Sequence, residues 1–122
     1  MNKASVMVVF NNSDVLVIFR KSGKIGLIGG KSEPNEDPKE TAIRECYEES
    51  GIKVTRCREI FSLNVPGEVD YFTTAFLAEE YSGEIKSSHE GEIKFVPIND
   101  LCDSGKAEFS EYNIKLFREI GV

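Results

Sequence analysis

The chain lacks the features that mark membrane, secreted or nucleic-acid-binding proteins. No apolar run approaches the roughly twenty residues that a membrane-spanning helix needs. The N-terminal segment has one lysine before a short apolar run, which is more typical of a β-strand than of a signal peptide. Lysine and arginine total 15 against 21 aspartates and glutamates, whereas long nucleic acids require a basic surface. We therefore expect no membrane and no long nucleic acid among its partners.

Cysteine and histidine are scarce as well. The three cysteines, Cys46, Cys57 and Cys102, are odd in number and lack the spacing of a zinc site or a disulfide framework. They are typical of free thiols in a reducing compartment, so we expect a cytoplasmic protein. His89, the only histidine, is more typical of a surface side chain than of a catalytic group.

Length and pattern indicate one domain, residues 1–122, with an α+β order of elements. Apolar content of 40% and charged content of 30% are ordinary for a globular protein. The predicted strands are residues 4–10, 15–19, 25–28, 54–64, 69–80 and 93–97. The predicted helices are residues 38–50 and 110–120, with a short helical turn from residue 99. Between them we expect a glycine loop at 29–31, a turn at 66–67 and a polar loop at 83–91.

The most informative segment is residues 30–52, which read GKSEPNEDPKETAIRECYEESGI. Asp37 and Glu40 form the pattern of a capping box, and Pro38 suits the first position of a helix. Gly51 is typical of the residue that ends a helix. These signals predict one short helix that carries most of the acidic side chains of the segment.

The predicted helix has an acidic face and an apolar face. Glu45, Glu48 and Glu49 are spaced i, i+3 and i+4, so their side chains share one face. The adjacent apolar face is formed by Ala42, Ile43, Cys46 and Tyr47, and Glu49 borders it and is expected to be part-buried. A merely solvated charged face would gain from a lysine in the same stripe, and none is there. Clustered carboxylates favour a divalent metal and phosphate chemistry.

The full spacing is G-x5-E-x7-R-E-U-x-E-E-x-G-U, where U is apolar, and the chain matches every fixed position. Seven fixed positions match by chance roughly once in 10⁸ starts. The pattern resembles the Nudix box, with Cys46 in an apolar slot, and the remaining layout resembles a small Nudix domain. The resemblance implies an α/β/α sandwich with a mixed sheet, one catalytic helix and a C-terminal helix.

The same resemblance implies hydrolysis of a nucleoside diphosphate linked to another group, with Mg²⁺ or Mn²⁺ as cofactor. It assigns the following roles: Glu48 and Glu49 as main metal ligands, Glu45 as ligand or base, Arg44 as the group that orients the glutamates, Glu36 in the outer metal shell and the Gly29 carbonyl as a further ligand. Family members often supply another ligand or base about five residues before an aromatic. Glu90 precedes Phe95 by five residues, so we prefer it to Glu92.

Substrate contacts are expected from two segments. Gly30 and Lys31 lie where a phosphate would approach, although Lys31 also fits a solvated lysine. Asn113 resembles the asparagine that reads a purine edge in MutT-type enzymes, with Phe109 or Tyr112 stacked on the base. The alternative is that Asn113 is a helix cap and that the aromatic side chains belong to the core.

Three functions remain open. The first is a MutT-type (d)NTP pyrophosphohydrolase, for example of oxidised purine nucleotides, that yields a nucleoside monophosphate and pyrophosphate. The second is an ADP-ribose or nucleotide-sugar pyrophosphatase, for which Pro66, fourteen residues past Ile52, is a weak indication. The third is an inactive nucleotide-sensing module, which the complete acidic set argues against. We expect a small nucleotide as partner and a monomer or homodimer.

Overall fold

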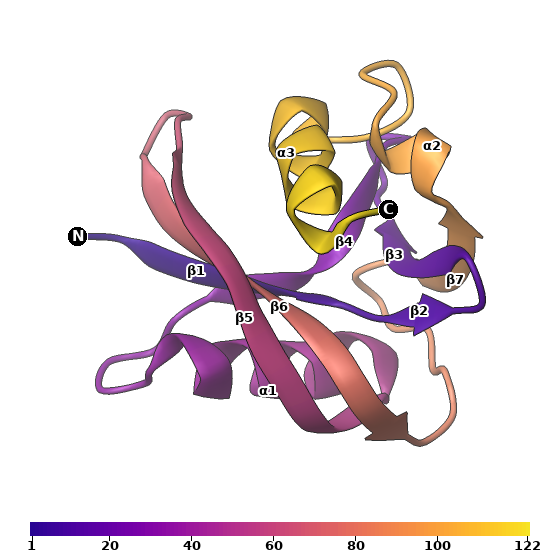
Figure 1. Ribbon diagram of the computed structural model, residues 1–122, viewed down its shortest axis with the longest axis horizontal. Coiled ribbons are helices and arrows are strands. Elements are labelled where there is room, and N and C mark those ends of the chain that lie inside the picture. Colours follow the sequence, from indigo (N-terminus) through magenta and orange to yellow (C-terminus); the bar gives the residue numbers. More distant parts are fainter.

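Two helices, α1 (Pro38–Ser50) and α3 (Ser110–Ile120), lie on opposite sides of a β-sheet in the computed structural model, which describes residues 1–122 (Figure 1). The other elements are β1 (Lys3–Val8), β2 (Phe10–Asn11), β3 (Asp14–Phe19), β4 (Ile25–Lys31), β5 (Lys53–Val65), β6 (Tyr71–Ser82), β7 (Glu92–Pro97) and the short α2 (Ile98–Leu101). The predicted α+β sandwich is confirmed.

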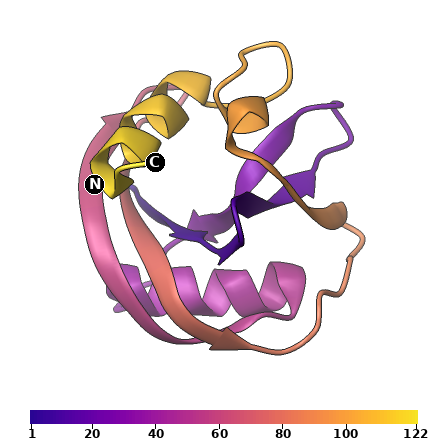
Figure 2. The same ribbon diagram turned by 45° about the vertical axis from the view of Figure 1, so that its right-hand side comes forward.

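The sheet has seven strands in the order β2-β3-β4-β1-β6-β5, with β7 paired to β3. Strands β1 and β6 are parallel and all other pairs are antiparallel, so the predicted mixed sheet is confirmed. The long strands β5 and β6 curl from the side of α3 to the side of α1 (Figure 2). Strand β4 is central because it pairs with β3 and β1 and then leads into α1.

The hydrophobic core lies in two layers, one on each face of the sheet. Alternate residues of a strand point to opposite faces. Met7 of β1 therefore packs in the layer that contains Ala42 and Cys46 of α1, whereas Val8 packs in the layer that contains Leu116 of α3. All five side chains are fully buried. This alternation fixes which side of β1 and β4 faces the acidic helix.

Helix α1 begins and ends at the predicted signals. The Glu40 N–H donates to the Asp37 carboxylate, and the Glu40 carboxylate accepts from the Asp37 N–H. Such a cap stabilises a helix by about 1 kcal/mol. At the other end Gly51 has φ 79°, a left-handed conformation that glycine adopts without steric cost. Both ends of the acidic helix are therefore fixed by local sequence.

Three predictions about local structure are wrong. The first strand does not run over residues 4–10, because the chain changes partners at Val9: β1 pairs with β4 and β6, and β2 pairs with β3 alone. Residues 29–31 do not form a loop but the end of β4, paired with residues 4–6 of β1. Tyr47 was expected on the apolar face of the helix but is 58% exposed. Cys46 lies near the centre of the buried face, and Tyr47 lies about 100° around the helix from Cys46.

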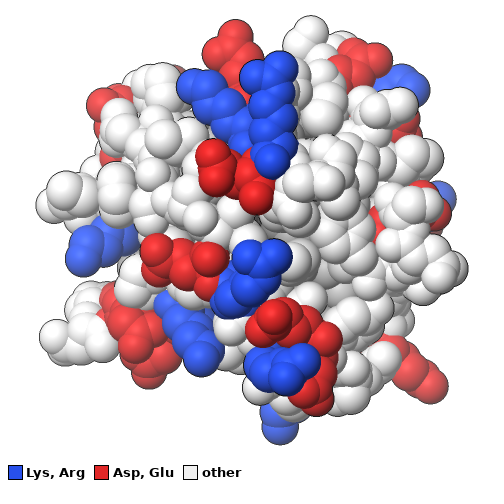
Figure 3. All heavy atoms as spheres, viewed as in Figure 1, with Lys and Arg blue, Asp and Glu red and all other residues white.

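None of the helices has the length and apolar composition to cross a membrane. On the face shown in Figure 3, lysine and arginine side chains are interspersed with aspartate and glutamate. Opposite charges also pair elsewhere along the chain: Arg56 Nε lies 3.2 Å from Glu80 Oε1, and Lys94 Nζ lies 3.2 Å from Glu92 Oε1. This face therefore has no extended basic surface.

Candidate active site

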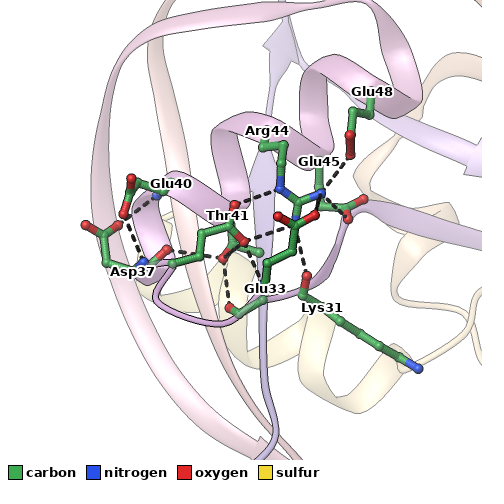
Figure 4. Close-up of polar contacts among 10 residues, drawn as sticks. Lys31, Glu33, Asp37, Glu40, Thr41, Arg44, Glu45 and Glu48 are labelled. Atoms are coloured by element: carbon green, nitrogen blue, oxygen red, sulfur yellow. Dashed lines mark hydrogen bonds and ion pairs between the residues drawn. The ribbon is translucent and has the colours of Figure 1, made fainter.

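The guanidinium of Arg44 is the centre of the acidic cluster (Figure 4). Its Nε and Nη2 donate to the two oxygens of Glu36 at 2.7 and 3.0 Å. Its Nη1 donates to Glu45 at 2.9 Å and to Glu48 at 2.7 Å, and its Nη2 also donates to the Lys31 carbonyl at 3.1 Å. One arginine thus ties the loop before α1, the end of β4 and two glutamates of α1 together. This arrangement matches the orienting role expected of Arg44.

Glu36 accepts two hydrogen bonds from Arg44 and is its main partner in the loop before α1. The hydrogen bonds from Arg44 lower the pKa of Glu36 to about 2, although burial opposes this, and they raise the pKa of Arg44. The Glu33 N–H and the Thr41 hydroxyl also donate to Glu36 Oε1. Both Glu36 oxygens therefore already accept hydrogen bonds. The structure assigns Glu36 to the positioning of Arg44, and its expected place in the outer metal shell stays a prediction.

Glu49 is the most buried carboxylate, at 4% exposure, and is more enclosed than the part-buried side chain expected. The Gly29 N–H donates to its Oε1 at 2.8 Å, and Nη1 of Arg20 lies 4.0 Å from its Oε2. Burial raises the pKa of Glu49 to about 7; Gly29 and Arg20 act in the opposite direction, whereas Glu45 and Glu90 raise it further. A carboxylate in such surroundings favours a cation beside it.

Glu45 lies directly over Gly30. A side chain at position 30 would overlap the Glu45 carboxylate, so only glycine leaves this place free. Burial raises the pKa of Glu45. Arg44 acts in the opposite direction, whereas the charge of Glu90 raises the pKa further. Glu90 acts on both Glu45 and Glu49, whereas Glu92 pairs with Lys94. The structure thus brings Glu90 to the cluster, as preferred from the sequence; its role as ligand or base stays a prediction.

The donor atoms suit Mg²⁺ or Mn²⁺, because carboxylate and carbonyl oxygens are the ligands that these cations take. No group of three acidic, histidine or cysteine side chains is already arranged around one point, however. The reason lies in the hydrogen bonds: Glu45 and Glu48 point to Arg44, and Glu49 points to Gly29. The residues fit such a metal by chemistry and burial, and ligation requires these carboxylates to turn.

A pocket of about 530 Å³ adjoins the cluster on the other face of β4. Its walls come from the end of β4, from the β5–β6 hairpin around residues 66–69 and from the start of α3. The five predicted substrate contacts all line it: Gly30, Lys31, Phe109, Tyr112 and Asn113. The Lys31 side chain extends away from Arg44, with its Nζ 5.4 Å from the ring centre of Tyr71 (Figure 4).

Asn113 is buried at the end of this pocket and is not a helix cap. Its Nδ2 donates to the carbonyls of Leu101 at 2.9 Å and Glu108 at 3.2 Å, and the N-cap of α3 is Phe109. Its Oδ1 accepts no hydrogen bond. The hydroxyl of Ser5 is the only completely buried side-chain polar atom without a hydrogen-bond partner. Because Asn113 Oδ1 also lacks a partner, it is not completely buried and keeps some access to solvent. It can therefore offer a ligand an acceptor but no donor.

The two aromatic candidates differ in environment. Tyr112 is buried, its ring lies 5.3 Å from that of Phe61, and its hydroxyl donates to the Thr73 carbonyl at 3.4 Å. Burial also raises the pKa of Tyr112. Phe109 is 59% exposed at the pocket rim with φ 54° and ψ 40°, a left-handed conformation rare for such a residue. Tyr112 belongs to the core, and Phe109 is the aromatic side chain available to a ligand.

Sequence reasoning missed Arg20 and Glu108. The Arg20 Nε donates to Glu108 Oε1 at 3.1 Å, and both residues line the pocket. They are 88 positions apart and belong to no recognisable motif. Only the sheet order, which places the end of β3 beside the segment before α3, brings them together.

The fold and site together match a known family. The NUDIX domain model matches residues 1–119. The chain belongs to the NUDIX domain family. This confirms the resemblance based on residues 30–52.

Curated relatives share the domain but differ in name. An RNA pyrophosphohydrolase from Bartonella henselae is 31% identical over 91 residues, 68% of this chain and 51% of the relative. A putative 8-oxo-dGTP diphosphatase 3 from Mycobacterium tuberculosis is 30% identical over 68% of this chain and 42% of the relative. An ADP-ribose pyrophosphatase from Bacillus subtilis is 29% identical, over 80% and 56%. The chain thus spans about half the length of these relatives.

The fold is also that of solved NUDIX structures. The MutT protein from Methanosarcina mazei superposes with a TM-score of 0.83 over 99% of this chain and 96% of that one. The two sequences are 23% identical. At this identity the similarity shows the fold and leaves the substrate open.

Proposed function

We propose that this NUDIX domain is a Mg²⁺-dependent hydrolase of phosphoanhydride bonds in nucleotides. The specific activity that we favour is that of a (d)NTP pyrophosphohydrolase, which releases a nucleoside monophosphate and pyrophosphate. The observation that carries the proposal is the position of the acidic face of α1, with Glu45, Glu48 and Glu49, beside a nucleotide-sized pocket that ends at Asn113. Pockets for small ligands usually measure about 300–1,000 Å³.

The acidic cluster would hold the metal. Glu48 and Glu49 would be the main ligands, joined by the Gly29 carbonyl and by whichever of Glu45 and Glu90 is not the base. When bound, Mg²⁺ or Mn²⁺ neutralises charge on the phosphates and lowers the pKa of a bound water. Arg44 donates charge-assisted hydrogen bonds to Glu45 and Glu48, which would turn from it toward the metal while staying beside its charge.

A general base must accept the proton of the attacking water. Glu45 and Glu90 are the two candidates, and the charge of Glu90 contributes to the raised pKa of Glu45. A base works best when its pKa lies near the working pH. Burial raises the pKa of Glu45, which favours it as the base and leaves Glu90 as the further ligand.

The pocket supports a nucleotide with its base at α3 and its phosphates at β4. Asn113 Oδ1 would accept an N–H of the base, and Phe109 would stack on it. Lys31 and the Gly30 backbone would contact the phosphates. Purines with an exocyclic amine or a ring N–H present the donor that Asn113 requires. An oxidised guanine nucleotide such as 8-oxo-dGTP meets this requirement and corresponds to the name of one relative.

A second candidate is an ADP-ribose or nucleotide-sugar pyrophosphatase. It is supported by the relative from Bacillus subtilis, which matches 80% of this chain. Pro66, which the sequence pointed to, also lines the pocket at the hairpin. An inactive nucleotide-sensing module is disfavoured, since binding alone has no need for Arg44 and three clustered glutamates. A cytoplasmic location and a monomeric or homodimeric state stay predictions.

A hydrolysis screen tests the proposal. It would compare dNTPs, 8-oxo-dGTP, ADP-ribose, dinucleoside polyphosphates and 5′-triphosphorylated RNA with and without Mg²⁺, with products separated by chromatography. Glu48→Gln serves as the inactive variant, and Glu59→Gln, an exposed glutamate of β5 without an ion pair, as the matched control.

Each outcome assigns a function. Pyrophosphate release from one triphosphate that Glu48→Gln loses and Glu59→Gln keeps supports the (d)NTP activity. AMP and ribose phosphate from ADP-ribose would move the assignment to the second candidate. Nucleotide binding without turnover of any compound would indicate a sensing module.

A further inference from the structure

Thr41 is a fully buried residue whose hydroxyl contacts Glu36, the main partner of Arg44. It lies three positions before Arg44 on α1, so both side chains are on the same side of the helix (Figure 4). Its Oγ1 lies 2.8 Å from Glu36 Oε1, 2.8 Å from Ser32 Oγ and 3.1 Å from the Asp37 carbonyl. Three polar atoms thus compete for the one proton that a threonine hydroxyl can donate.

The direction of these hydrogen bonds follows from the charges. Glu36, with a pKa of about 2, is ionised at neutral pH, whereas the Asp37 carbonyl is neutral and already accepts the Thr41 N–H. A hydrogen bond to a charged acceptor is roughly twice as strong as one to a neutral acceptor. Thr41 therefore donates to Glu36, and the Ser32 hydroxyl donates to Thr41. We call this one-way series, Ser32 to Thr41 to Glu36, the hydroxyl relay.

The hydroxyl relay begins at the sheet and ends in a loop. Ser32 follows the last residue of β4, and its N–H donates to the carbonyl of Lys3 in β1 at 2.9 Å. Glu36, at the other end, lies in the segment between β4 and α1 and belongs to neither. The relay therefore connects the sheet to a carboxylate that no helix or strand holds in place.

Arg44 depends on Glu36 most when the site is in use. Arg44 also donates to Glu45 and Glu48, but both of these carboxylates would turn toward a metal. The two hydrogen bonds to Glu36, at 2.7 and 3.0 Å, then remain to fix the plane of the guanidinium. A group that holds Glu36 in place therefore also holds the charge of Arg44 beside the catalytic glutamates.

We propose that Thr41, with Ser32 behind it, is a positioning residue that orients Arg44 through Glu36. Neither Ser32 nor Thr41 lines the pocket, so neither is placed to contact a nucleotide. Loss of the relay should therefore lower turnover without weakening substrate binding, because only the geometry of the acidic cluster changes. The effect on turnover rests on the proposed function of the site, whereas the effect on the position of Arg44 does not.

A second threonine–serine pair supplies the matched control. Thr74 of β6 is 3% exposed and its Oγ1 lies 2.9 Å from Ser62 Oγ, but it contacts no carboxylate. Thr41→Val and Thr74→Val each remove a buried hydroxyl and keep the shape of the side chain. Thr41→Ser keeps the hydroxyl, and Ser32→Ala, alone or combined with Thr41→Val, removes the first donor. Thermal unfolding shows whether each variant is folded.

Turnover of the nucleotide that wild type hydrolyses is the first readout. Thr41→Val should lower kcat about tenfold or more and leave KM unchanged. Thr41→Ser should retain the wild-type kcat, and Thr74→Val should lose stability but no turnover. Ser32→Ala should lower kcat less than Thr41→Val does. Adding Ser32→Ala to Thr41→Val should lower kcat no further, because the relay is already broken at Thr41.

The second readout needs neither metal nor substrate. The Nε–H of Arg44 donates to Glu36 Oε2 at 2.7 Å, so it should exchange slowly with solvent, and NMR in EDTA measures the rate. Arg44→Lys removes this signal and so identifies it. Thr41→Val should speed the exchange about tenfold, the usual effect of losing a hydrogen bond to a charged group. Thr41→Ser and Thr74→Val should keep the wild-type rate.

Wild-type exchange of the Arg44 Nε–H in Thr41→Val would overturn the proposal, whatever the protein hydrolyses. An equal loss of kcat in Thr74→Val would also overturn it, because a buried hydroxyl would then act only through the fold. A further loss of kcat in the double variant would overturn the role of Ser32. If wild type hydrolyses no nucleotide, the proposed function fails, and the exchange rates alone decide whether Thr41 holds Arg44 in place.

Discussion

The carboxylate of Glu45 occupies the space that a side chain on Gly30 would fill. This carboxylate is the end of a flexible side chain, so it can turn away. At Gly29 the corresponding space is taken by the carbonyl oxygen of Ser5, a backbone atom of the paired strand β1. Two adjacent glycines therefore have different roles: one leaves room for a side chain of the site, and the other lets two strands approach.

Alanine substitutions separate these roles. We expect Gly30→Ala to displace Glu45 and lower turnover about 100-fold, since a small misplacement of a catalytic group has that effect. Its unfolding free energy should change by less than about 1 kcal/mol. Gly29→Ala should instead lose about 1 to 3 kcal/mol of stability, because backbone must move. Steady-state kinetics and urea unfolding check both, and wild-type turnover in Gly30→Ala would contradict the role of Gly30.

The ion pair between Glu36 and Arg44 gives a pH-dependent stability. The folded pKa of Glu36, about 2, lies below its ordinary value of 4.5, so the ionised form is favoured by folding. Its contribution is complete above pH 4.5 and is lost as pH falls through 2. Because Glu36 is near the surface, we expect only about 1 to 2 kcal/mol at neutral pH.

Urea unfolding of wild type and Glu36→Gln between pH 3 and 7 measures this contribution. Wild type should be the more stable protein at pH 7, and the difference should shrink as the pH falls toward 3. Other carboxylates titrate in both proteins and largely cancel in the difference. A difference that stays constant over this range would mean that the loss comes from packing and not from charge.

Burial predicts that the three thiols react differently. Cys46 is fully buried on the inner face of α1, and burial raises its pKa to about 11. At pH 8 its thiolate fraction is therefore about one in a thousand. Cys57 and Cys102 are partly exposed, so we expect them to react first with a thiol reagent and Cys46 to react only after urea unfolding. Mass spectrometry of labelled peptides checks the order, and equal labelling of all three in the folded protein would contradict it.

The sequence predicted what depends on neighbours along the chain. The limits of α1 and the shared face of Glu45 and Glu48 follow from caps and helical spacing, and both are as predicted. The strand character of Gly29 was not predictable, because it depends on pairing with β1. The contact of Arg20 with Glu108 was equally hidden, since it joins positions 88 apart.

Burial of side chains outside α1 was also beyond the sequence. Phe109 and Tyr112 are three positions apart near the start of α3, and nothing local tells which one faces the core. The curl of β5 decides this by bringing Phe61 against Tyr112. Phe109 is left exposed in a left-handed conformation that costs about 1 kcal/mol or more for a side chain of this kind. Such a cost at a pocket rim favours a role in binding.

Substitution of Phe109 tests that role by opposite effects on stability and binding. Asparagine tolerates the left-handed conformation better, so Phe109→Asn should raise the unfolding free energy by about 0.5 to 1 kcal/mol. It should also raise the KM of the preferred nucleotide about tenfold, because stacking on the base is lost. Phe109→Tyr keeps the ring and should keep KM. If Phe109→Asn retains the wild-type KM, the exposed ring has no part in binding and the left-handed backbone requires another explanation.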